Sequence, residues 1–339
     1  MVPVIVFLYV TLSVLITSDN LLVIAAVYST RTLRKVTNYS LVSLAFADLL
    51  VGCVVLPVRA VEAWAFHWSR NILWCQFSLS LTLLSLSASV LNLLIVTIER
   101  YLAIILPFTY ASKITTRRNF YVIMLVWVAA FLVSFLPFVA LKSTTAQERE
   151  QQHKVCRFAD TLSSEYLVFF SATVVFIPTL CISLAYLRIY FAAIKLRARL
   201  KSLQVQQEGE DNIASVLKES KTAKTIGVVV GVFYLCWIPF LIAVVLSAFF
   251  KDLITPVVVL VISTLVFSNS AINPVLYGFL NRDFRLAYKR LIPRLSRMCA
   301  RDIPPLQRRR GYDVSQLSMR DNTSCPNVQG VSITTRVTV

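Results

Sequence analysis

Charged residues are scarce in this sequence. Asp, Glu, Lys and Arg make up 15% of its 339 residues, whereas apolar residues make up 57%. Soluble globular domains carry about 25% charged residues, so this composition excludes an ordinary water-soluble domain and favours lipid as the main solvent. Glycine is scarce as well, with 7 residues in all, which excludes a glycine-rich fibrous or disordered chain.

Groups of residues that carry out catalysis are lacking too. Both histidines, His67 and His153, lie outside the apolar segments, and we find no Ser/His/Asp, Cys/His or metal-ligand constellation. The sequence also lacks the internal repeats that secondary transporters usually show, and its apolar segments lack the polar stripes of a channel pore. We therefore expect no enzyme. A membrane transporter remains the alternative from another functional class.

The apolar residues are gathered into segments that are each long enough to cross a bilayer, which takes about 20 helical residues. This pattern predicts an all-α membrane protein, with a seven-transmembrane helix bundle over residues 1–280. The stretch 281–294 predicts a short amphipathic eighth helix beside the membrane, and 295–339 a disordered cytoplasmic tail. The predicted spans are 3–29, 39–62, 75–98, 120–141, 165–194, 223–248 and 254–280.

The net charge of +17 suggests a nucleic-acid partner until the basic residues are located. When the chain alternates sides from an outside N-terminus, 27 of the 34 Lys and Arg residues fall on one face and 7 on the other. This positive-inside pattern predicts a multi-pass plasma-membrane protein with its N-terminus outside and its C-terminus in the cytoplasm. The basic charge is then a topology signal and an attraction to inner-leaflet lipid, and we expect no nucleic acid as partner.

Three cysteines lie where their chemistry matters. Cys75 and Cys156 both fall on the outer, oxidising side, where disulfides persist. We expect them to pair and tie the loop that carries Cys156 over the bundle; two free thiols are the alternative. Cys299 follows the amphipathic segment on the basic side, where palmitoylation would hold that segment on the membrane, and an unmodified tail cysteine is the alternative.

Polar side chains interrupt three of the apolar spans at a similar depth. Asp48, Ser89, Asn269 and Asn273 are all embedded in apolar surroundings. Ionisable residues inside a membrane are rare and usually functional, and the two asparagines share a helix face because they are four residues apart. Their oxygen atoms predict a site for a sodium ion, the one ion expected to act on this protein, without any other cofactor. Interhelical hydrogen bonds are the alternative.

A second polar group lies where the third span reaches the cytoplasm. Glu99 and Arg100 stand there, and Tyr186, Glu219 and Tyr277 are placed near the same depth on other spans. Arg100 therefore has two sets of partners, carboxylates in one arrangement and phenols in another, which is what a two-state switch requires. A charged pair that merely reaches to the membrane surface is the alternative.

Prolines in the last four spans add to this interpretation. Pro137, Pro178, Pro239 and Pro274 each free one backbone carbonyl, weaken one helical turn and permit bending. Pro274 stands beside Asn273, so the seventh span carries a breaker next to a buried amide. We expect this combination to make the helix bistable.

Taken together, these features resemble a rhodopsin-type (class A) G-protein-coupled receptor over roughly residues 5–292. The resemblance implies a ligand pocket above Trp237, a sodium site around Asp48, and a cytoplasmic crevice that opens for GTP exchange on a heterotrimeric G protein. It also implies that arrestin and receptor kinases act on the Ser/Thr-containing tail. The matching residues are Asn20, Asp48, Cys75, "ERY" (99–101), Trp127, Pro178, "CWIPF" (236–240) and "NPVLY" (273–277).

The pocket departs from several known subgroups of that family. Amine receptors carry an aspartate in the third span, seven residues after the disulfide cysteine, and here Thr82 stands there. We therefore expect a ligand other than a cationic amine. Phe267 replaces the lysine of opsins. The stretches "CRFAD" and "YLRIYFAA" resemble adenosine receptors, and Phe158 matches their purine-stacking residue, but Val244 and Phe267 depart from them. An adenosine-like purine receptor is the alternative.

The expected lining of the pocket is mostly apolar with a polar minority, and Arg59 and Glu62 lie near its rim. Such a lining favours a small extracellular ligand that is lipophilic or weakly polar. The alternative is that several of these side chains face neighbouring helices or lipid. The expected lining residues are Thr82, Leu83, Leu86, Phe158, Phe170, Ser171, Val174, Trp237, Phe240, Leu241, Val244, Ser263 and Phe267.

Overall fold

The computed structural model describes residues 2–65, 72–106, 110, 114–140, 162–204, 231–246 and 255–301. Residues 1–295 belong to one compact unit, and the description below concerns that unit; the described residues beyond it, 296–301, are the end of helix α13. Residues 302–339 of the predicted tail, and the positions of Cys156, Phe158 and Glu219, lie outside the described residues. The first part of the predicted disordered tail, 295–301, is helical instead.

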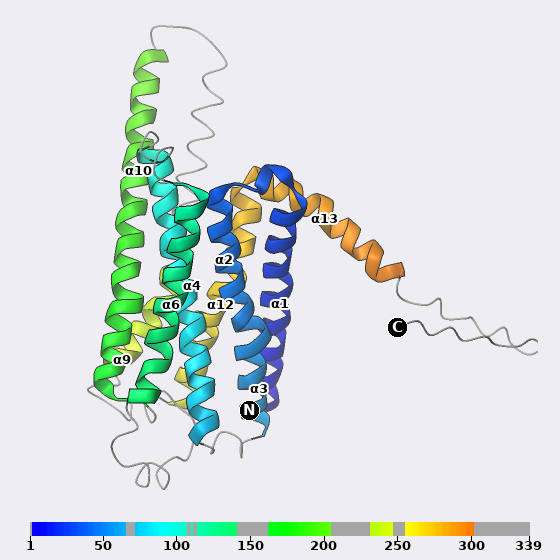
Figure 1. Ribbon diagram of the computed structural model, residues 1–339, viewed down its shortest axis with the longest axis vertical. Coiled ribbons are helices and arrows are strands. Elements are labelled where there is room, and N and C mark those ends of the chain that lie inside the picture. The colour runs from blue at the N-terminus through cyan, green and yellow to red at the C-terminus, as the bar shows by residue number, and fades with distance from the viewer. Residues whose placement is uncertain are drawn as a thin grey trace, which may run out of the picture. The chain divides into compact units, whose positions relative to one another are not determined.

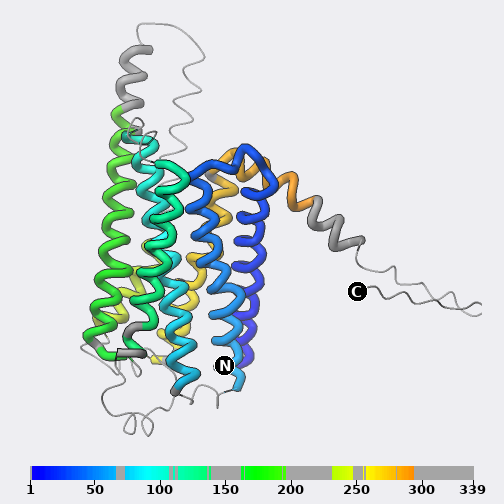
Figure 2. The backbone as a smooth tube through the Cα atoms, in the orientation of Figure 1, coloured from blue at the N-terminus to red at the C-terminus, as the bar shows by residue number. Residues whose placement is uncertain are grey.

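The described chain is helical, and its helices lie side by side (Figures 1 and 2). Six of them are long and apolar enough to cross a membrane, and the shorter apolar helix Gly231–Leu246 lies between α10 and α12 in sequence. The predicted seven-helix bundle is confirmed. Its elements are α1 (Val2–Ser29), η1 (Arg31–Leu33), α2 (Val36–Leu50), η2 (Val51–Val55), α3 (Leu56–Trp64), α4 (Ile72–Ile105), α6 (Thr116–Ala140), α9 (Ser164–Phe170), η5 (Ser171–Phe176), α10 (Ile177–Gln204), α12 (Pro256–Leu280) and α13 (Arg282–Arg301).

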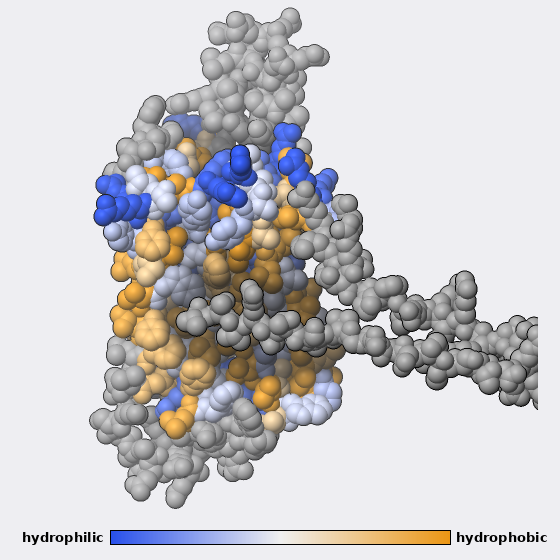
Figure 3. Space-filling view, turned by 45° about the vertical axis from the view of Figure 1, so that its right-hand side comes forward, coloured by the Kyte–Doolittle hydropathy of each residue, from blue (hydrophilic) through white to orange (hydrophobic). Residues whose placement is uncertain are grey.

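On the face that Figure 3 shows, hydrophobic residues form a belt across the middle of the described bundle, and strongly hydrophilic residues gather mainly at one end. Exposed basic residues of the first connection and of the start of α6 contribute to that end: Arg31, Arg34, Lys35, Arg117 and Arg118. The belt agrees with a multi-pass membrane protein. Which side each end of the bundle faces stays a prediction.

The helices differ from the predicted spans mainly in length. Helix α4 was predicted over 75–98 but extends to Ile105, so Glu99 and Arg100 lie within it rather than beyond its end. Helix α13 was predicted over 281–294, and it continues through Pro293 to Arg301. Charged residues and a proline therefore led to predicted helix ends at 98 and 294, but both helices continue beyond them.

Prolines interrupt the backbone hydrogen bonds of two helices without ending them. Helices α6 and α12 run through Pro137 and Pro274. Because Pro274 has no N–H, the carbonyl of Ser270 four residues earlier loses its usual donor. The side chain of Asn20 replaces it: its Nδ2 donates to Ser270 O at 3.1 Å and to Ile16 O at 2.9 Å. Asn20 therefore ties α1 to the turn of α12 that Pro274 interrupts.

Helix α4 is the most enclosed of the spans. In its most apolar 18-residue window 72% of the residues are buried, against 11% in α1 and 17% in α6. The hydroxyls of Ser80, Thr82 and Ser85 donate to the carbonyls four residues earlier, at 2.8, 2.9 and 2.9 Å. These bonds satisfy small polar side chains inside a close-packed helix. Because these polar side chains are satisfied within α4 itself, other helices can pack closely against it.

Small residues also bring α2, α4 and α6 together. Ala47, Ala88 and Ala130 form a buried cluster, each with no exposed surface. Small residues let helix backbones come close where lipid provides no driving force for association. The indole Nε1 of Trp127 donates to Ser43 Oγ at 3.0 Å and joins α6 to α2. This accounts for the tryptophan within an otherwise lipid-facing helix.

Helix α13 packs on the end of α1 and on the connection that follows it. Phe284 and Ala287 are buried in a cluster with Val27 and Leu33. The ring of Phe284 also lies 5.9 Å from that of Tyr277, centroid to centroid, so α13 contacts the end of α12. Cys299 lies near the end of α13, and its lipidation stays a prediction.

At Gly52 the second span lies close against α1. A Cβ at this position would lie 2.7 Å from Thr17 Oγ1 and 3.1 Å from the Thr17 backbone nitrogen. The hydroxyl of Ser13 donates to Gly52 O at 2.6 Å, which fixes the two helices at this distance. A larger residue must therefore push α1 away.

We expect Gly52→Ala to lower the free energy of unfolding by about 1–3 kcal/mol, as overpacking does elsewhere. The measurement is the melting temperature of the purified protein in detergent. Gly231→Ala is the matched control, because no described atom lies within 4 Å of a Cβ there and alanine favours a helix. Equal melting temperatures for the two variants would contradict the close approach at Gly52.

Candidate functional site

Most of the predicted pocket residues are brought together. Trp237, Phe240 and Leu241 of the helix Gly231–Leu246 belong to or pack against one hydrophobic cluster. The rings of Trp237 and Phe240 meet edge to face, with centroids 6.0 Å apart. Val244 and Ser263 are only half-buried. The other predicted apolar residues of the same cluster are Leu83, Leu86, Phe170, Val174 and Phe267.

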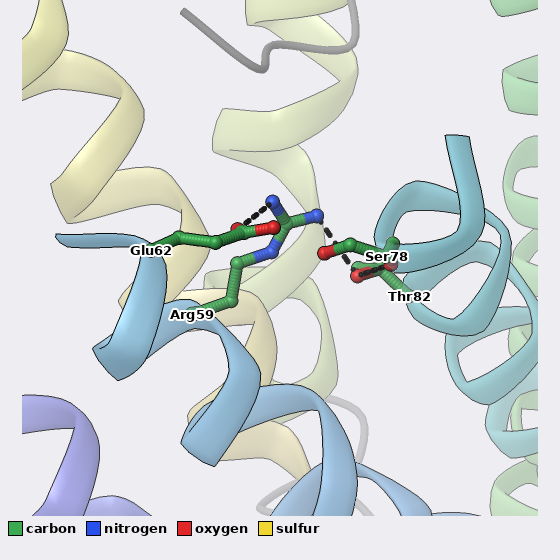
Figure 4. Close-up of polar contacts among 4 residues, drawn as sticks. All are labelled: Arg59, Glu62, Ser78 and Thr82. Carbon is green, nitrogen blue, oxygen red and sulfur yellow. Dashed lines mark hydrogen bonds and ion pairs between the residues drawn. The ribbon is translucent and has the colours of Figure 1, made fainter. Parts of the chain in front are cut away.

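The Arg59 side chain of α3 lies between Glu62 of the same helix and Thr82 on α4 (Figure 4). Arg59 Nη1 lies 2.9 Å from Glu62 Oε2, and Arg59 Nη2 donates to Thr82 Oγ1 at 3.0 Å. The Thr82 hydroxyl in turn donates to the carbonyl of Ser78 at 2.9 Å. The Arg59–Glu62–Thr82 group thus links the second span to the third.

This group is nearly enclosed by protein. The side chains of Arg59 and Glu62 are 14% and 8% exposed. A buried ion pair needs hydrogen bonds beyond its own contact to offset the loss of water, and Thr82 supplies one of them. The second carboxylate oxygen, Glu62 Oε1, has no hydrogen-bond partner among the described residues. It can therefore accept a bond from a further donor.

Arg59 and Glu62 were expected near the rim of the pocket and not in its lining. A signal was present, because opposite charges three residues apart lie on one face of a helix and stand out in an apolar span. The depth of the two side chains and their contact with Thr82 come from the packing of α3 against α4.

Other buried polar atoms near the apolar cluster also lack partners within the described chain. They belong to side chains of α4, η5, the helix Gly231–Leu246 and α12. Native proteins satisfy the great majority of such atoms with protein, water or ligand. These atoms therefore favour a bound molecule or ordered water in this part of the bundle. They are Ser78 Oγ, Ser171 Oγ, Trp237 Nε1 and Thr264 Oγ1.

A second polar cluster lies deeper in the bundle, around Asp48. Ser89 Oγ donates to Asp48 Oδ1 at 3.0 Å, and Asn273 Nδ2 donates to Asp48 Oδ2 at 3.0 Å. Asp48 has no exposed surface, and Asn269 is buried one turn before Asn273. The carboxylate therefore joins α2, α4 and α12, as the sequence predicted for residues of equal depth.

The donor set around Asp48 suits a hard cation. The Asp48 carboxylate and the Ser89 hydroxyl offer oxygen atoms, which Na⁺ prefers over nitrogen or sulfur, whereas Asn273 turns its Nδ2 toward the carboxylate. The bonds from Ser89 and Asn273 leave lone pairs on both carboxylate oxygens. Within the described chain no group of three or more His, Cys, Asp and Glu residues gathers, so a site for a transition metal finds no support there. The sodium site stays a prediction.

Glu99, near the end of α4 that is predicted to face the cytoplasm, is held by neutral partners. Ser40 Oγ donates to Glu99 Oε1 at 2.7 Å and lies 3.1 Å from Asn119 Oδ1. Asn119 Nδ2 donates to Val36 O at 2.9 Å. This cluster ties α2, α4 and α6 together. Neither Ser40 nor Asn119 was singled out in the sequence, because hydroxyl and amide partners carry no charge pattern.

The structure shows only some of the features that were predicted for the switch around Arg100. The ion pairs within the described chain do not include Arg100, and Glu99 Oε2 has no hydrogen-bond partner there. Tyr186 and Tyr277 both pack against the large hydrophobic cluster. The Tyr277 hydroxyl is buried without a partner among the described residues. The exchange of partners at Arg100 stays a prediction.

Of the two cysteines of the predicted disulfide, only Cys75 lies among the described residues. Cys75 is 2% exposed and is disulfide-bonded. Cys156 lies outside the described residues, so the pairing of these two residues stays a prediction. Cys53, Cys181 and Cys236 are free, as expected for cysteines within spans.

Comparison with known proteins supports the architecture. Residues 19–277 match the family described as 7 transmembrane receptor (rhodopsin family). The chain is 31% identical to the octopamine receptor beta-1R of Drosophila melanogaster over 301 residues, which cover 81% of this chain and 59% of that receptor. It is 31% identical to the human histamine H2 receptor over 275 residues, 81% of this chain and 75% of that receptor.

A further relative is the 5-hydroxytryptamine receptor 4 of Cavia porcellus, 34% identical over 289 residues, which cover 79% of this chain and 74% of that receptor. These relatives are named for octopamine, histamine and 5-hydroxytryptamine, which are small amines. The predicted nearness to adenosine receptors is therefore not supported. The prediction of a ligand other than a cationic amine conflicts with this finding as well.

Proposed function

The chain belongs to the rhodopsin family of seven-transmembrane receptors, and from this membership we propose that a small extracellular amine drives it to promote GTP exchange on a heterotrimeric G protein. Its relatives are receptors and not enzymes. The ligand class is argued below from the Arg59–Glu62–Thr82 group.

The proposal of an amine ligand rests on the Glu62 carboxylate. An ammonium group that leaves water for a buried site requires a carboxylate there. The buried carboxylates among the described residues are Asp48, Glu62 and Glu99. Asp48 lies in the deeper cluster with Ser89 and Asn273, and Glu99 lies in the cluster with Ser40, so neither belongs to the outer group with Thr82. Glu62 Oε1 is the atom that supports binding of an ammonium in the outer part of the bundle.

The rest of the pocket suits the body of such a molecule. Phe170, Trp237 and Phe267 are buried in one cluster, and flat aromatic rings pack well against such side chains. Ser171 Oγ, buried and unpaired within the described chain, offers a polar contact on the η5 side. An amine with a ring and a polar substituent fits both kinds of contact.

A sodium ion is proposed as a modulator at the second polar cluster. Asp48, Ser89, Asn269 and Asn273 would hold it through oxygen atoms, and the ion would neutralise the carboxylate charge. Arrestin, receptor kinases and inner-leaflet lipid are proposed as further partners, from the Ser/Thr-containing tail and the basic residues of the cytoplasmic side. The N-terminus is proposed to lie outside the cell.

GTP exchange in membranes that contain the full-length chain tests the ligand class. Octopamine, histamine and 5-hydroxytryptamine are the probes, each paired with an analogue that has a hydroxyl in place of the amine. We expect at least one amine, and none of the analogues, to raise exchange. Glu62→Gln should raise the half-maximal concentration about 100-fold, because it removes a charge-assisted hydrogen bond worth about 2–3 kcal/mol.

Matched surface expression of the wild type and of Glu62→Gln is the control for folding. Measurable basal exchange with no response to any of the three amines would count against the ligand class, although not against the receptor itself. An amine response that Glu62→Gln leaves unchanged would show that another group holds the ammonium.

A further inference from the structure

The cation nearest to Glu62 belongs to the chain itself. The Arg59 guanidinium contacts the Glu62 carboxylate at 2.9 Å and the Thr82 hydroxyl at 3.0 Å. A ligand ammonium offers the same chemistry, a positive charge with N–H donors, to the same two side chains. Arg59 thus donates to Thr82, on α4, a hydrogen bond from a positively charged N–H group, as an amine would (Figure 4).

We propose that Arg59 is a built-in competitor for the ammonium group of the ligand and thereby sets the amine affinity of this receptor. The inference rests on the proposed function, in which Glu62 accepts the amine. In the unliganded protein Arg59 neutralises Glu62 and occupies Thr82. A bound amine shares the Glu62 carboxylate with Arg59 through Oε1, the oxygen that has no partner in the described chain.

Electrostatics give the expected size of the competition. Two unit charges about 6 Å apart, at an effective dielectric constant of about 20, repel each other by an energy equal to roughly a hundredfold in affinity. The Arg59 side chain is 14% exposed, so water screens part of this repulsion. We therefore expect removal of the Arg59 charge to strengthen amine binding by at least about tenfold.

A purely structural role for Arg59 gives a different expectation. If Arg59 only fastens α3 to α4, its loss destabilises the pocket and weakens the binding of any ligand. The two roles therefore predict opposite changes in amine potency. Lysine separates them further, because it keeps the charge but lacks the planar fork that reaches two partners at once.

The experiment measures amine-driven GTP exchange in membranes for wild type, Arg59→Gln, Arg59→Met, Arg59→Lys, Glu62→Gln and the double variant Arg59→Gln/Glu62→Gln. Octopamine, histamine and 5-hydroxytryptamine are again the probes. Val61→Ala is the matched control on the same helix, since Val61 is 43% exposed and touches none of the three groups through an ion pair or hydrogen bond in the described chain.

Arg59→Gln and Arg59→Met should each lower the half-maximal amine concentration at least about tenfold, whereas Arg59→Lys should stay within about threefold of wild type. The double variant should respond more strongly than Glu62→Gln, because the repulsion is gone, but more weakly than Arg59→Gln, because the carboxylate is absent. Arg59→Met covers the case in which Arg59→Gln does not reach the cell surface, because its apolar side chain keeps the packing volume.

Three results would overturn the inference in different ways. Unchanged or higher half-maximal concentrations in both neutral variants, with a Glu62-dependent response in wild type, would refute the competitor and leave the proposed function standing. Equal gains in Arg59→Lys and Arg59→Gln would show that shape, and not charge, sets the affinity. Basal exchange without an amine response in any variant would refute the proposed ligand class, and the competitor with it.

Discussion

Replacing Asp48 by asparagine is expected to abolish the effect of sodium on basal GTP exchange. In the wild type, exchange should be lower in sodium chloride than in potassium chloride of equal concentration. An ion at Asp48 would hold α2, α4 and α12 in the arrangement in which Ser89 and Asn273 both bond to the carboxylate. A contribution of about 1.4 kcal/mol changes the population of that arrangement about tenfold. Asparagine keeps the shape of the side chain but removes the charge that binds the ion.

Ser89→Ala is the comparison for this experiment, because it removes one hydroxyl and leaves the carboxylate in place. We expect it to weaken the sodium effect without abolishing it. If Asp48→Asn retained the full difference between sodium and potassium, the ion would act elsewhere. The cluster around Asp48 would then be a set of interhelical hydrogen bonds, the alternative that the sequence left open.

Tyr277→Phe is expected to make the protein more heat-stable and less active at the same time. The Tyr277 hydroxyl is buried without a partner in the described chain, and an unpaired buried hydroxyl costs about 1–3 kcal/mol. Phenylalanine removes this cost and keeps the ring contact with Phe284. The same change removes the phenol that is predicted to bond to Arg100 in the active arrangement. Basal exchange should therefore fall about tenfold, and the melting temperature should rise by a few degrees.

Tyr28→Phe is the matched control, since the Tyr28 side chain is 65% exposed and loses little with its hydroxyl. Glu219→Ala provides a test of sign, because it removes a predicted partner of Arg100 in the resting arrangement and should raise basal exchange. Tyr277→Phe and Glu219→Ala moving basal exchange in the same direction would be incompatible with two alternative partner sets for Arg100.

The bundle and its deep polar cluster were predictable because they depend on properties of single segments. An apolar run long enough to cross a bilayer predicts a transmembrane helix. A carboxylate within such a run needs hydrogen-bond partners, whatever the arrangement of the helices. Asp48, Ser89 and Asn273 were therefore expected to meet. The bond from Asn20 to the carbonyl that Pro274 frees follows the same logic, although the donor itself was not predicted.

The partners of Glu99 and the outer charged group were not predictable in this way. Ser40 and Asn119 are neutral residues of other helices, and nothing in their local sequence marks them as partners of a carboxylate. The expectation of a ligand other than a cationic amine, which conflicts with the names of the relatives, rested on Thr82 alone. Thr82 lacks a carboxylate, but a neighbouring span can deliver one to the same place, and Glu62 lies on α3 beside Arg59, which contacts Thr82.

The unequal enclosure of the spans has a consequence for how the sequence can diverge. Acyl chains are fluid and adapt to any apolar outline, so outward positions of α1 and α6 can exchange one apolar residue for another freely. Around α4 the neighbours are fixed helices, and Ser85, Ser87 and Ser89 are each at most 3% exposed. Only residues of similar volume fit there. Evolutionary drift should therefore be slow along α4 and fast on the lipid-facing sides of α1 and α6.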